Sequence, residues 1–308
     1  ASPSGIQCTL EYLNEGGANI VFQITPKSPD DDLSSKLLRL HKDLPHAQSA
    51  RDQLRSFQEL LYPLFEPENL IQPTLIELDN TIAKTLNASL NHVTRPSRRK
   101  NDFLPLGETH GLSVLDMTPQ RGETLLQFKP KWLALPPGIP DRARRCRTCA
   151  QRARRAAGAI KTATDLQETC PLALIHPDLS TRTATASALT SDPQIQQYLI
   201  HGAPKLLQRL KSHQLRLDPK GVLEIDLPDQ ISHLCQAMTL RDCTLLVKRT
   251  CQGIDARLVD LDLKQPQQVE KWEKVELDLR DGGWYTATEN PQSHPKDDIC
   301  LLSKAETV

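Results

Sequence analysis

Two acidic segments in the C-terminal part of the chain contain residue types that can transfer a phosphoryl group. Asp242 stands in the tetrapeptide Arg-Asp-Cys-Thr, and Asp260 and Asp262 alternate with apolar residues up to Lys264. In a phosphoryl-transfer site one carboxylate accepts the proton of the attacking hydroxyl, while another holds the magnesium ion that bridges the phosphates. The alternation over 257–264 predicts a strand with these charges on one face. A solvated strand face with paired charges is the common alternative for such a pattern.

A pair of glycines near the N-terminus has the character of a phosphate-binding turn. Gly16 and Gly17 separate two β-rich runs and are followed by Ala18 and Asn19. Without a side chain, glycine lets the backbone approach phosphate oxygens and offer them N–H groups. The pair matches no dinucleotide or Walker pattern, so on this motif alone a plain hairpin turn is the favoured interpretation.

Basic residues gather in the middle of the chain. Lys129 and Lys131 are two positions apart and are expected on one side of a strand, and seven arginines follow within 142–155. On a helix, one stripe would carry Arg144, Arg147, Gln151 and Arg155. Because guanidinium groups bind phosphate through paired hydrogen bonds, several together indicate a polyanionic ligand. A solvated basic helix or a localisation signal explains the stripe equally well.

The eight cysteines do not form the dense pattern of a small disulfide-bonded protein, so we expect a reducing nucleus or cytoplasm. Cys146 and Cys149 make one CxxC pair, with Cys170 and His176 downstream. A structural zinc ion needs four ligands. Since one pair with scattered further candidates is weak evidence, we predict that Cys146 and Cys149 do not form a zinc site on which folding depends.

The elements that must position these residues are predicted from hydrophobic periodicity and turn residues. Strands are expected over 8–24 with a central turn, 36–40, 111–117, 125–132 and 242–248, and helices over 47–65, 76–90, 141–157, 193–211 and 228–238. Pro119 and Gly122 mark a change of composition that predicts two domains, 1–118 and 119–308.

The composition argues against two classes of protein, those with a surface devoted to nucleic acid and those with membrane helices. The 308 residues include 38 basic and 38 acidic side chains, a balance that argues against a surface devoted to nucleic acid. No run approaches the roughly 20 apolar residues of a membrane helix, so no membrane attachment is expected.

Taken in order, these segments resemble the inositol-pentakisphosphate 2-kinase family. Its members share a Glu-Gly-Gly/Ala-Ala-Asn loop, a Lys-x-x-Arg strand, a Lys-Pro-Lys segment, a basic helix, a Pro-Leu-Asp-Leu stretch, Arg/Lys-Asp-Cys-Ser/Thr and Asp-Leu-x-Leu-Lys. The counterparts here are 15–19, 36–39, 129–131, 146–155, 171–174, 241–244 and 260–264. The resemblance spans nearly the whole chain and implies a two-lobed, kinase-like α+β fold with a β-rich N-lobe and a larger, mixed C-lobe.

The resemblance also implies an activity, which is ATP- and magnesium-dependent phosphorylation of the 2-hydroxyl of inositol 1,3,4,5,6-pentakisphosphate to the hexakisphosphate. It implies that Asp242 is the catalytic base and that Asp260 and Asp262 hold magnesium. Nucleotide contacts would come from Gly16, Gly17, Ala18, Asn19, Arg39 and Asp116. Substrate phosphates would contact Lys129, Lys131, Arg147, Arg155 and Lys264.

Five positions depart from the family pattern, which places the details of the inositol pocket in question. Ala173 replaces an aspartate, Gln151 a common histidine and His201 an asparagine, and Gln268 and Trp272 stand at about the places of a frequent arginine and tyrosine. Two alternatives remain: another inositol polyphosphate kinase, and a non-enzymatic polyanion- or RNA-binding module using the arginine-rich segment. We expect a monomer of the nucleus or cytoplasm, or both, that binds inositol pentakisphosphate and ATP and has no specific nucleic-acid partner.

Overall fold

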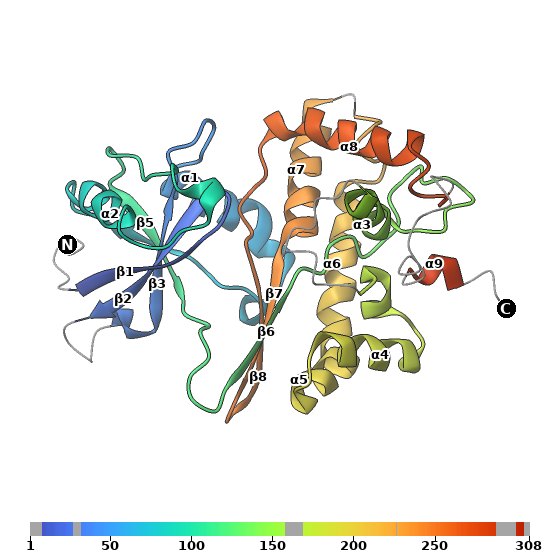
Figure 1. Cartoon of the computed structure of the whole chain (residues 1–308), viewed down its shortest axis with the longest axis horizontal. Coiled ribbons are helices and arrows are strands. Elements are labelled where there is room, and N and C mark those ends of the chain that lie inside the picture. The colour runs from blue at the N-terminus through green and yellow to red at the C-terminus, as the bar shows by residue number, and fades with distance from the viewer. Residues whose placement is uncertain (1–7, 27–31, 158–168, 226, 288–299, 305–308) are drawn as a thin grey trace. The chain divides into compact units, whose positions relative to one another are not determined.

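The computed structural model describes residues 8–26, 32–157, 169–225, 227–287 and 300–304 (Figure 1). The chain divides into two compact units, an N-terminal unit of Ala1–Thr118 and a C-terminal unit of Pro119–Val308. A five-stranded sheet, a three-stranded sheet and many helices confirm the predicted α+β class. Among the described residues, no helix combines the length and the apolar character that crossing a membrane requires.

The N-terminal unit contains the five-stranded sheet, in the order β1-β2-β3-β5-β4 with every neighbouring pair antiparallel. Its strands are β1 (Cys8–Glu15), β2 (Asn19–Pro26), β3 (Lys36–His41), β4 (Thr74–Glu77) and β5 (His110–Leu115). The predicted hairpin around the glycine pair is therefore confirmed, as is the third strand. The helix expected over 76–90 is wrong at its start, because Ile76 pairs with Gly111 in the sheet.

Two helices of this unit follow from local sequence. Helix α1 (Ala50–Ser56) begins after Ser49, whose hydroxyl oxygen accepts from the backbone N–H of Asp52, and a π-helical turn continues it over Phe57–Leu61. Helix α2 (Ile82–Leu90) follows a turn in which the Asp79 carboxylate accepts from the backbone N–H of Thr81. The buried residues of α2 are spaced as on one helical face and join the core with residues of β2 and β3: Ile82, Ala83, Leu86 and Leu90.

In the C-terminal unit, one end of each of three strands lies at the same end of the sheet. Its order is β6-β7-β8, with β6 (Thr124–Phe128), β7 (Thr244–Thr250) and β8 (Gly253–Val259), all antiparallel. Phe128 pairs with Leu245, and Thr244 pairs with Val259. The end of β6, the start of β7 and the end of β8 therefore meet, and the segments beyond them carry the predicted site residues.

Each of these three strand boundaries differs from the prediction. Strand β6 ends at Phe128 rather than 132, because Pro130 cannot donate to a ladder. Strand β8 ends before Asp260, whose φ of 58° lies outside the β region, so the alternating face does not continue to Lys264. Asp242 is the last residue of a helix and not the start of a strand.

Helices make up most of the rest of this unit (Figure 1). They are α3 (Arg147–Ala157), α4 (Leu179–Leu189), α5 (Pro193–Gln197), α6 (Ala203–Leu217), α7 (Pro228–Asp242), α8 (Val269–Asp281) and α9 (Leu301–Lys304). Helices α6 and α7 pack against each other, and α3 packs against α8. The helix expected over 141–157 begins only at Arg147, and the one expected over 193–211 changes to a π-helical turn at Tyr198–Gly202.

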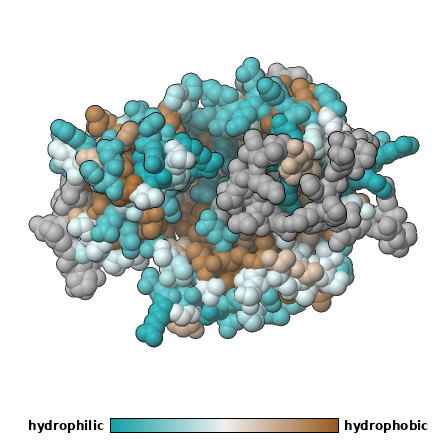
Figure 2. Space-filling view, viewed as in Figure 1, coloured by the Kyte–Doolittle hydropathy of each residue, from teal (hydrophilic) through white to brown (hydrophobic). Residues whose placement is uncertain are grey.

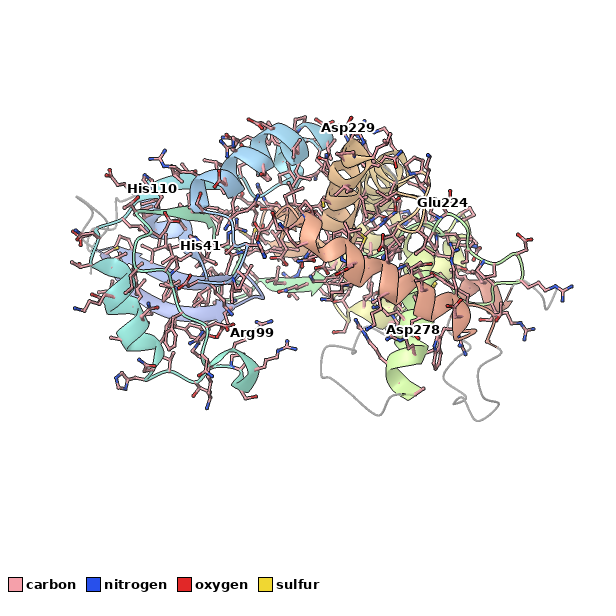
Figure 3. All side chains as sticks on the ribbon, turned by 90° about the horizontal axis from the view of Figure 1, so that it is seen from above. His41, Arg99, His110, Glu224, Asp229 and Asp278 are labelled. Carbon is pink, nitrogen blue, oxygen red and sulfur yellow. The ribbon has the colours of Figure 1, made fainter. Side chains whose placement is uncertain are left out.

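Polar side chains tie α3 to α8. Arg154 forms an ion pair with Asp278, which Figure 3 labels on α8. The large exposed apolar side chains, such as Leu106 and Leu227, are far apart in sequence, and Figure 2 shows hydrophilic residues over much of the visible surface of each unit.

Candidate active site

The Asp242 carboxylate lies among three lysine ammonium groups. Its Oδ1 is 3.1 Å from Lys129 Nζ and 3.0 Å from Lys131 Nζ, and its Oδ2 is 2.8 Å from Lys264 Nζ. Lys129 Nζ also donates to the Asp242 carbonyl oxygen at 2.7 Å, as a cation at a helix C-terminus can. The structure thus brings together four predicted site residues from three segments that are distant in sequence, which we call the Asp242 cluster.

Gln214 on α6 holds the backbone at Lys131. Its Nε2 donates to the Lys131 carbonyl at 2.9 Å, and its Oε1 accepts from the backbone N–H of Leu133 at 3.1 Å. Lys131 has a φ of 58°, which is unfavourable for a residue with a side chain. Lys129 and Lys131 therefore reach one carboxylate oxygen through a turn and not, as predicted, through the alternation of a strand.

Trp132 lies between two buried guanidinium groups. The guanidinium carbon of Arg241 is 3.6 Å from the ring centroid and that of Arg147 is 4.3 Å from it. Arg241 NH1 is 2.5 Å from an oxygen of Asp218, and Arg147 Nε is 2.8 Å from an oxygen of Glu276. These contacts fix both the residue before Asp242 and the residue after Lys131.

The arginines of the predicted basic stripe differ in burial. Arg147 is buried in its pair with Glu276 and in its stacking on Trp132, whereas Arg155 is exposed at the end of α3. The charge of Arg155 is near enough to lower the pKa of Lys131. Of the two arginines predicted to bind substrate, Arg155 is therefore the accessible one, and the role of Arg147 stays a prediction.

Burial and charge act in opposite directions on the Asp242 cluster. Burial raises the pKa of Asp242, but the ammonium groups of Lys131, Lys264 and Lys129 together bring that pKa well below its usual range. Burial lowers the pKa of Lys131, which Asp242 opposes and the charges of Lys129 and Arg155 reinforce. The carboxylate is therefore ionised at neutral pH, and Lys131 is held in a site where additional negative charge would be favourable.

Asp260 and Asp262 follow β8 directly. The Asp260 carboxylate is exposed and accepts from the Thr244 hydroxyl at 2.6 Å, which holds it beside the start of β7. The carbonyl of Asp262 accepts from the Thr239 hydroxyl, whose oxygen accepts from the backbone N–H of Lys264 at 2.9 Å. Thr239 thereby fixes the segment that carries Lys264 to Asp242.

The glycine turn of the N-terminal unit is open. Gly16 N–H donates to the Asn19 carbonyl at 2.8 Å, and a Cβ added at Gly17 would meet no atom within 4 Å. Neither glycine has a positive φ, so the turn itself does not require glycine. The absence of side chains leaves room for a ligand to approach the backbone.

A buried ionic network anchors this turn. Glu15, the last residue of β1, is 2.6 Å from Lys42 Nζ and accepts from Arg95 Nε and NH2 at 2.8 and 3.0 Å. Lys42 also lies 2.9 Å from Asp102, and Arg99, labelled in Figure 3, donates to the Glu15 carbonyl. We call these five residues the Glu15 network. They fix the end of β1 next to the turn and leave its glycines exposed.

The other predicted nucleotide residues lie elsewhere in the N-terminal unit. Arg39, on β3, donates to the Gln53 side chain at 3.3 Å, and Asp116, just after β5, accepts from the backbone N–H of Thr118 at 2.8 Å. Arg39 pairs with Val21 in the sheet, two positions after Asn19, and so shares a face with both. Their contact with a nucleotide stays a prediction.

Several residues that shape these sites were missed from the sequence: Lys42, Arg95, Asp102, Trp132, Gln214, Asp218, Arg241 and Glu276. Only Trp132 and Arg241 had a signal, because they adjoin predicted site residues. Most of the others act across 60 or more positions, as Lys42 and Asp102 do. Asp218, just after α6, pairs with Arg241 23 positions further along the chain.

Three ammonium groups lie around one carboxylate, and further carboxylates follow the adjacent strand end. Such an arrangement is typical of sites that hold phosphate groups beside a proton acceptor. Comparison with known proteins gives the family. The sequence model of a protein family described as inositol-pentakisphosphate 2-kinase matches residues 12–199 and 194–278. A protein of Yarrowia lipolytica (strain CLIB 122 / E 150) named inositol-pentakisphosphate 2-kinase is 27% identical over 300 residues, covering 89% of this chain and 91% of the relative. The chain belongs to the inositol-pentakisphosphate 2-kinase family, as the resemblance predicts.

Proposed function

We propose that the protein transfers the γ-phosphoryl group of ATP to the 2-hydroxyl of inositol 1,3,4,5,6-pentakisphosphate, giving the hexakisphosphate. The observation that carries the proposal is the Asp242 cluster, in which three ammonium groups surround one carboxylate. The membership of the family supports the same activity.

The excess of positive charge suits a compact polyphosphate. One carboxylate neutralises one of the three lysines, so the cluster retains a surplus that substrate phosphates would neutralise by charge-assisted hydrogen bonds. Arg155 is exposed and near enough to Lys131 to lower its pKa, which places a further guanidinium group beside the cluster. Such convergence of cations from a turn, a helix end and a strand end matches a small ligand better than a long nucleic acid.

Substrate binding would also prepare Asp242. In the ligand-free protein the three ammonium groups lower the pKa of its carboxylate, which makes it a weak proton acceptor. When substrate phosphates share those ammonium groups, the carboxylate regains basicity and can accept the hydrogen bond of the attacking hydroxyl. Because the transition state of phosphoryl transfer is loose, orienting that hydroxyl matters more than removing its proton early.

Asp260 and Asp262 have the oxygen donors that Mg²⁺ requires, since Mg²⁺ is typically held by one or two carboxylates together with substrate phosphates. The exposure of Asp260 and its fixed contact with Thr244 fit that role. A bound magnesium ion would neutralise charge on the nucleotide phosphates.

The open glycine turn is the proposed phosphate contact of the nucleotide. Gly16, Gly17 and Ala18 are exposed, and Asn19 begins β2 directly behind them. Backbone N–H groups at such a turn can donate to phosphate oxygens. Arg39 and Asp116 complete the proposed nucleotide contacts.

Turnover with a panel of inositol phosphates, ATP and magnesium tests the proposal. We expect inositol 1,3,4,5,6-pentakisphosphate to be phosphorylated to a single hexakisphosphate product, and isomers with a free hydroxyl elsewhere to react poorly. Preferred phosphorylation at another ring position would indicate a different inositol polyphosphate kinase. No turnover with any member, together with tight and salt-resistant RNA binding, would favour the polyanion-binding alternative.

A further inference from the structure

A glutamine occupies a position on α6 where the sequence pattern predicts an apolar residue. The buried residues of α6 follow one helical face: Ala203, Leu206, Leu207, Leu210, Gln214 and Leu217. Gln214 is the polar member of this face, and it is 1% exposed. Because burying an amide is unfavourable unless its hydrogen bonds are satisfied, the partners of Gln214 indicate what it does.

These partners belong to both segments that form the Asp242 cluster. The Nε2 of Gln214 donates to the carbonyl of Lys131 at 2.9 Å and to that of Leu240 at 3.4 Å, and its Oε1 accepts from the backbone N–H of Leu133 at 3.1 Å. The backbone carbonyl of Gln214 also accepts from Arg241 NH2 at 3.4 Å. One residue of α6 therefore joins the turn after β6 to the C-terminal end of α7.

The turn needs such support. Lys131 has a φ of 58°, a left-handed conformation that is unfavourable for a residue with a Cβ, and Pro130 before it has no N–H to contribute. In this conformation the ammonium groups of Lys129 and Lys131 lie 3.1 and 3.0 Å from the same oxygen of Asp242. The Gln214 hydrogen bonds offset the cost of the turn that places both ammonium groups there.

The chemistry of the side chain matches this task. An amide offers one donor and one acceptor, which meet the carbonyl of Lys131 and the N–H of Leu133. Methionine has a similar length and offers neither of them at comparable strength. An ionised glutamate would place a second oxygen against the carbonyl of Lys131, whereas a protonated glutamic acid would again offer a donor and an acceptor.

We propose that Gln214 is a positioning residue for the inositol phosphate. It holds Lys131 in the left-handed turn, so that the ammonium groups of Lys131 and Lys129 are fixed beside Asp242 before the substrate binds. Gln214 is buried and acts through Lys131, without touching the substrate itself. The inference rests on the proposed function, which assigns the phosphates of the substrate to the Asp242 cluster.

Steady-state kinetics of Gln214→Met test the proposal. The KM for inositol pentakisphosphate should rise by about 5- to 30-fold, which corresponds to the cost of about 1–2 kcal/mol for a left-handed residue, while the KM for ATP stays the same. Gln236→Met, which replaces another buried glutamine, on α7, is the matched control and should keep both KM values. In a Lys131→Met background, Gln214→Met should change the KM for the inositol phosphate by less than about twofold, because the residue through which it acts is already lost.

Gln214→Glu adds a readout that a merely structural role would not give. Burial raises the pKa of the introduced carboxyl, which is active as the protonated acid. Relative to wild type, kcat/KM of this variant should therefore be highest at acid pH and fall as pH rises. Should Gln214→Met fail to fold, this pH profile decides the question, and a constant ratio to wild type across the pH range would overturn the proposal.

Two further results would overturn the role of Gln214 while the proposed function stands. One is a folded Gln214→Met protein that phosphorylates inositol pentakisphosphate with wild-type KM, and the other is an effect of Gln214→Met that is unchanged in the Lys131→Met background. If the wild type binds inositol pentakisphosphate in calorimetry without turnover, the proposed function fails, and a 5- to 30-fold weaker affinity of Gln214→Met still supports the positioning role at about 1–2 kcal/mol. A wild type that does not bind inositol pentakisphosphate would overturn both.

Discussion

The protein contains two charged networks that differ in burial and in balance. In the Glu15 network the carboxylates of Glu15 and Asp102 contact Lys42 and Arg95, and a third cation, Arg99, donates to the Glu15 carbonyl. The side chains of Glu15 and Lys42 are 0% exposed. The Asp242 cluster has one carboxylate and three cations, with side chains 29% to 39% exposed. The first is largely closed to solvent and each of its carboxylates has a cationic partner, so it supports structure. The second is more open and has more cations than carboxylates, so it can accept a negatively charged ligand.

The comparison has a physical basis. A buried charge without a partner is strongly unfavourable, so a network removed from water must pair every charge it contains. A half-exposed cluster keeps part of its hydration and tolerates an excess of one sign until a ligand arrives. The two networks should therefore respond to mutation in different ways, one in stability and the other in catalysis.

The largest effect is expected from Asp242→Asn. The variant removes the proton acceptor and keeps the shape of the side chain, so turnover of inositol pentakisphosphate should fall by about 10²- to 10⁴-fold while the fold persists. Steady-state kinetics and thermal unfolding measure the two properties. Asp229→Asn, at an exposed residue of α7 labelled in Figure 3, is the matched control. A folded Asp242→Asn protein with wild-type kcat would remove Asp242 from the mechanism.

Lys42→Met tests the closed network. It leaves the buried Glu15 and the partly exposed Asp102 with one cation fewer, which should lower the free energy of unfolding of the N-terminal unit by about 3–5 kcal/mol. Urea unfolding, with hydrogen exchange to localise the effect, is the measurement. Lys84→Met, at an exposed position of α2, should cost little. Equal stability of the two variants would contradict the structural role of the network.

Lys129→Ala and Arg155→Ala test the open cluster. Each should raise KM for the inositol phosphate by about 10- to 150-fold, because a charge-assisted phosphate contact contributes about 1.5–3 kcal/mol. The KM for ATP should change little. Lys205→Ala, which removes an exposed lysine on α6, is the control for nonspecific loss of charge. A rise confined to the KM for ATP would assign these cations to the nucleotide instead.

The pH dependence of the Glu15 network is the smallest expected effect. Burial raises the pKa of Glu15, but hydrogen bonds from Arg95 and Lys42 and their charges leave it lowered. A lowered carboxyl pKa contributes stability above the unfolded value of about 4.3 and loses it as pH falls through the folded value. The difference in unfolding free energy between wild type and Glu15→Gln should therefore be full near neutral pH and shrink below about pH 4.

Glu11→Gln, at an exposed position of β1, is the control for this measurement and should show no such trend. A difference between wild type and Glu15→Gln that stays constant down to acid pH would show that Glu15 acts by shape and not by charge.

Local patterns in the sequence determined much of the N-terminal unit and the order of the functional motifs. Alternation and the glycine pair predicted the β1–β2 hairpin, because pleating and turn conformation are properties of neighbouring residues. The same reasoning failed at Ile76, where a short strand finds its partner in β5. A four-residue strand carries too little periodicity to reveal a pairing that lies 35 positions away.

Tertiary structure alone decided how the site residues meet. Lys131 and Asp242 are 111 positions apart, and they meet because β6 pairs with β7 and because Gln214 holds a left-handed turn after Pro130. Arg147 and Arg155 lie on one predicted stripe, yet packing against Trp132 buries the first and leaves the second exposed. Likewise, no pattern around Cys146 in the sequence indicates that Cys300 lies beside it in the structure. Periodicity describes how a segment folds on itself, whereas the partner of each face is set by which burial of apolar surface and pairing of charge the whole chain can satisfy together.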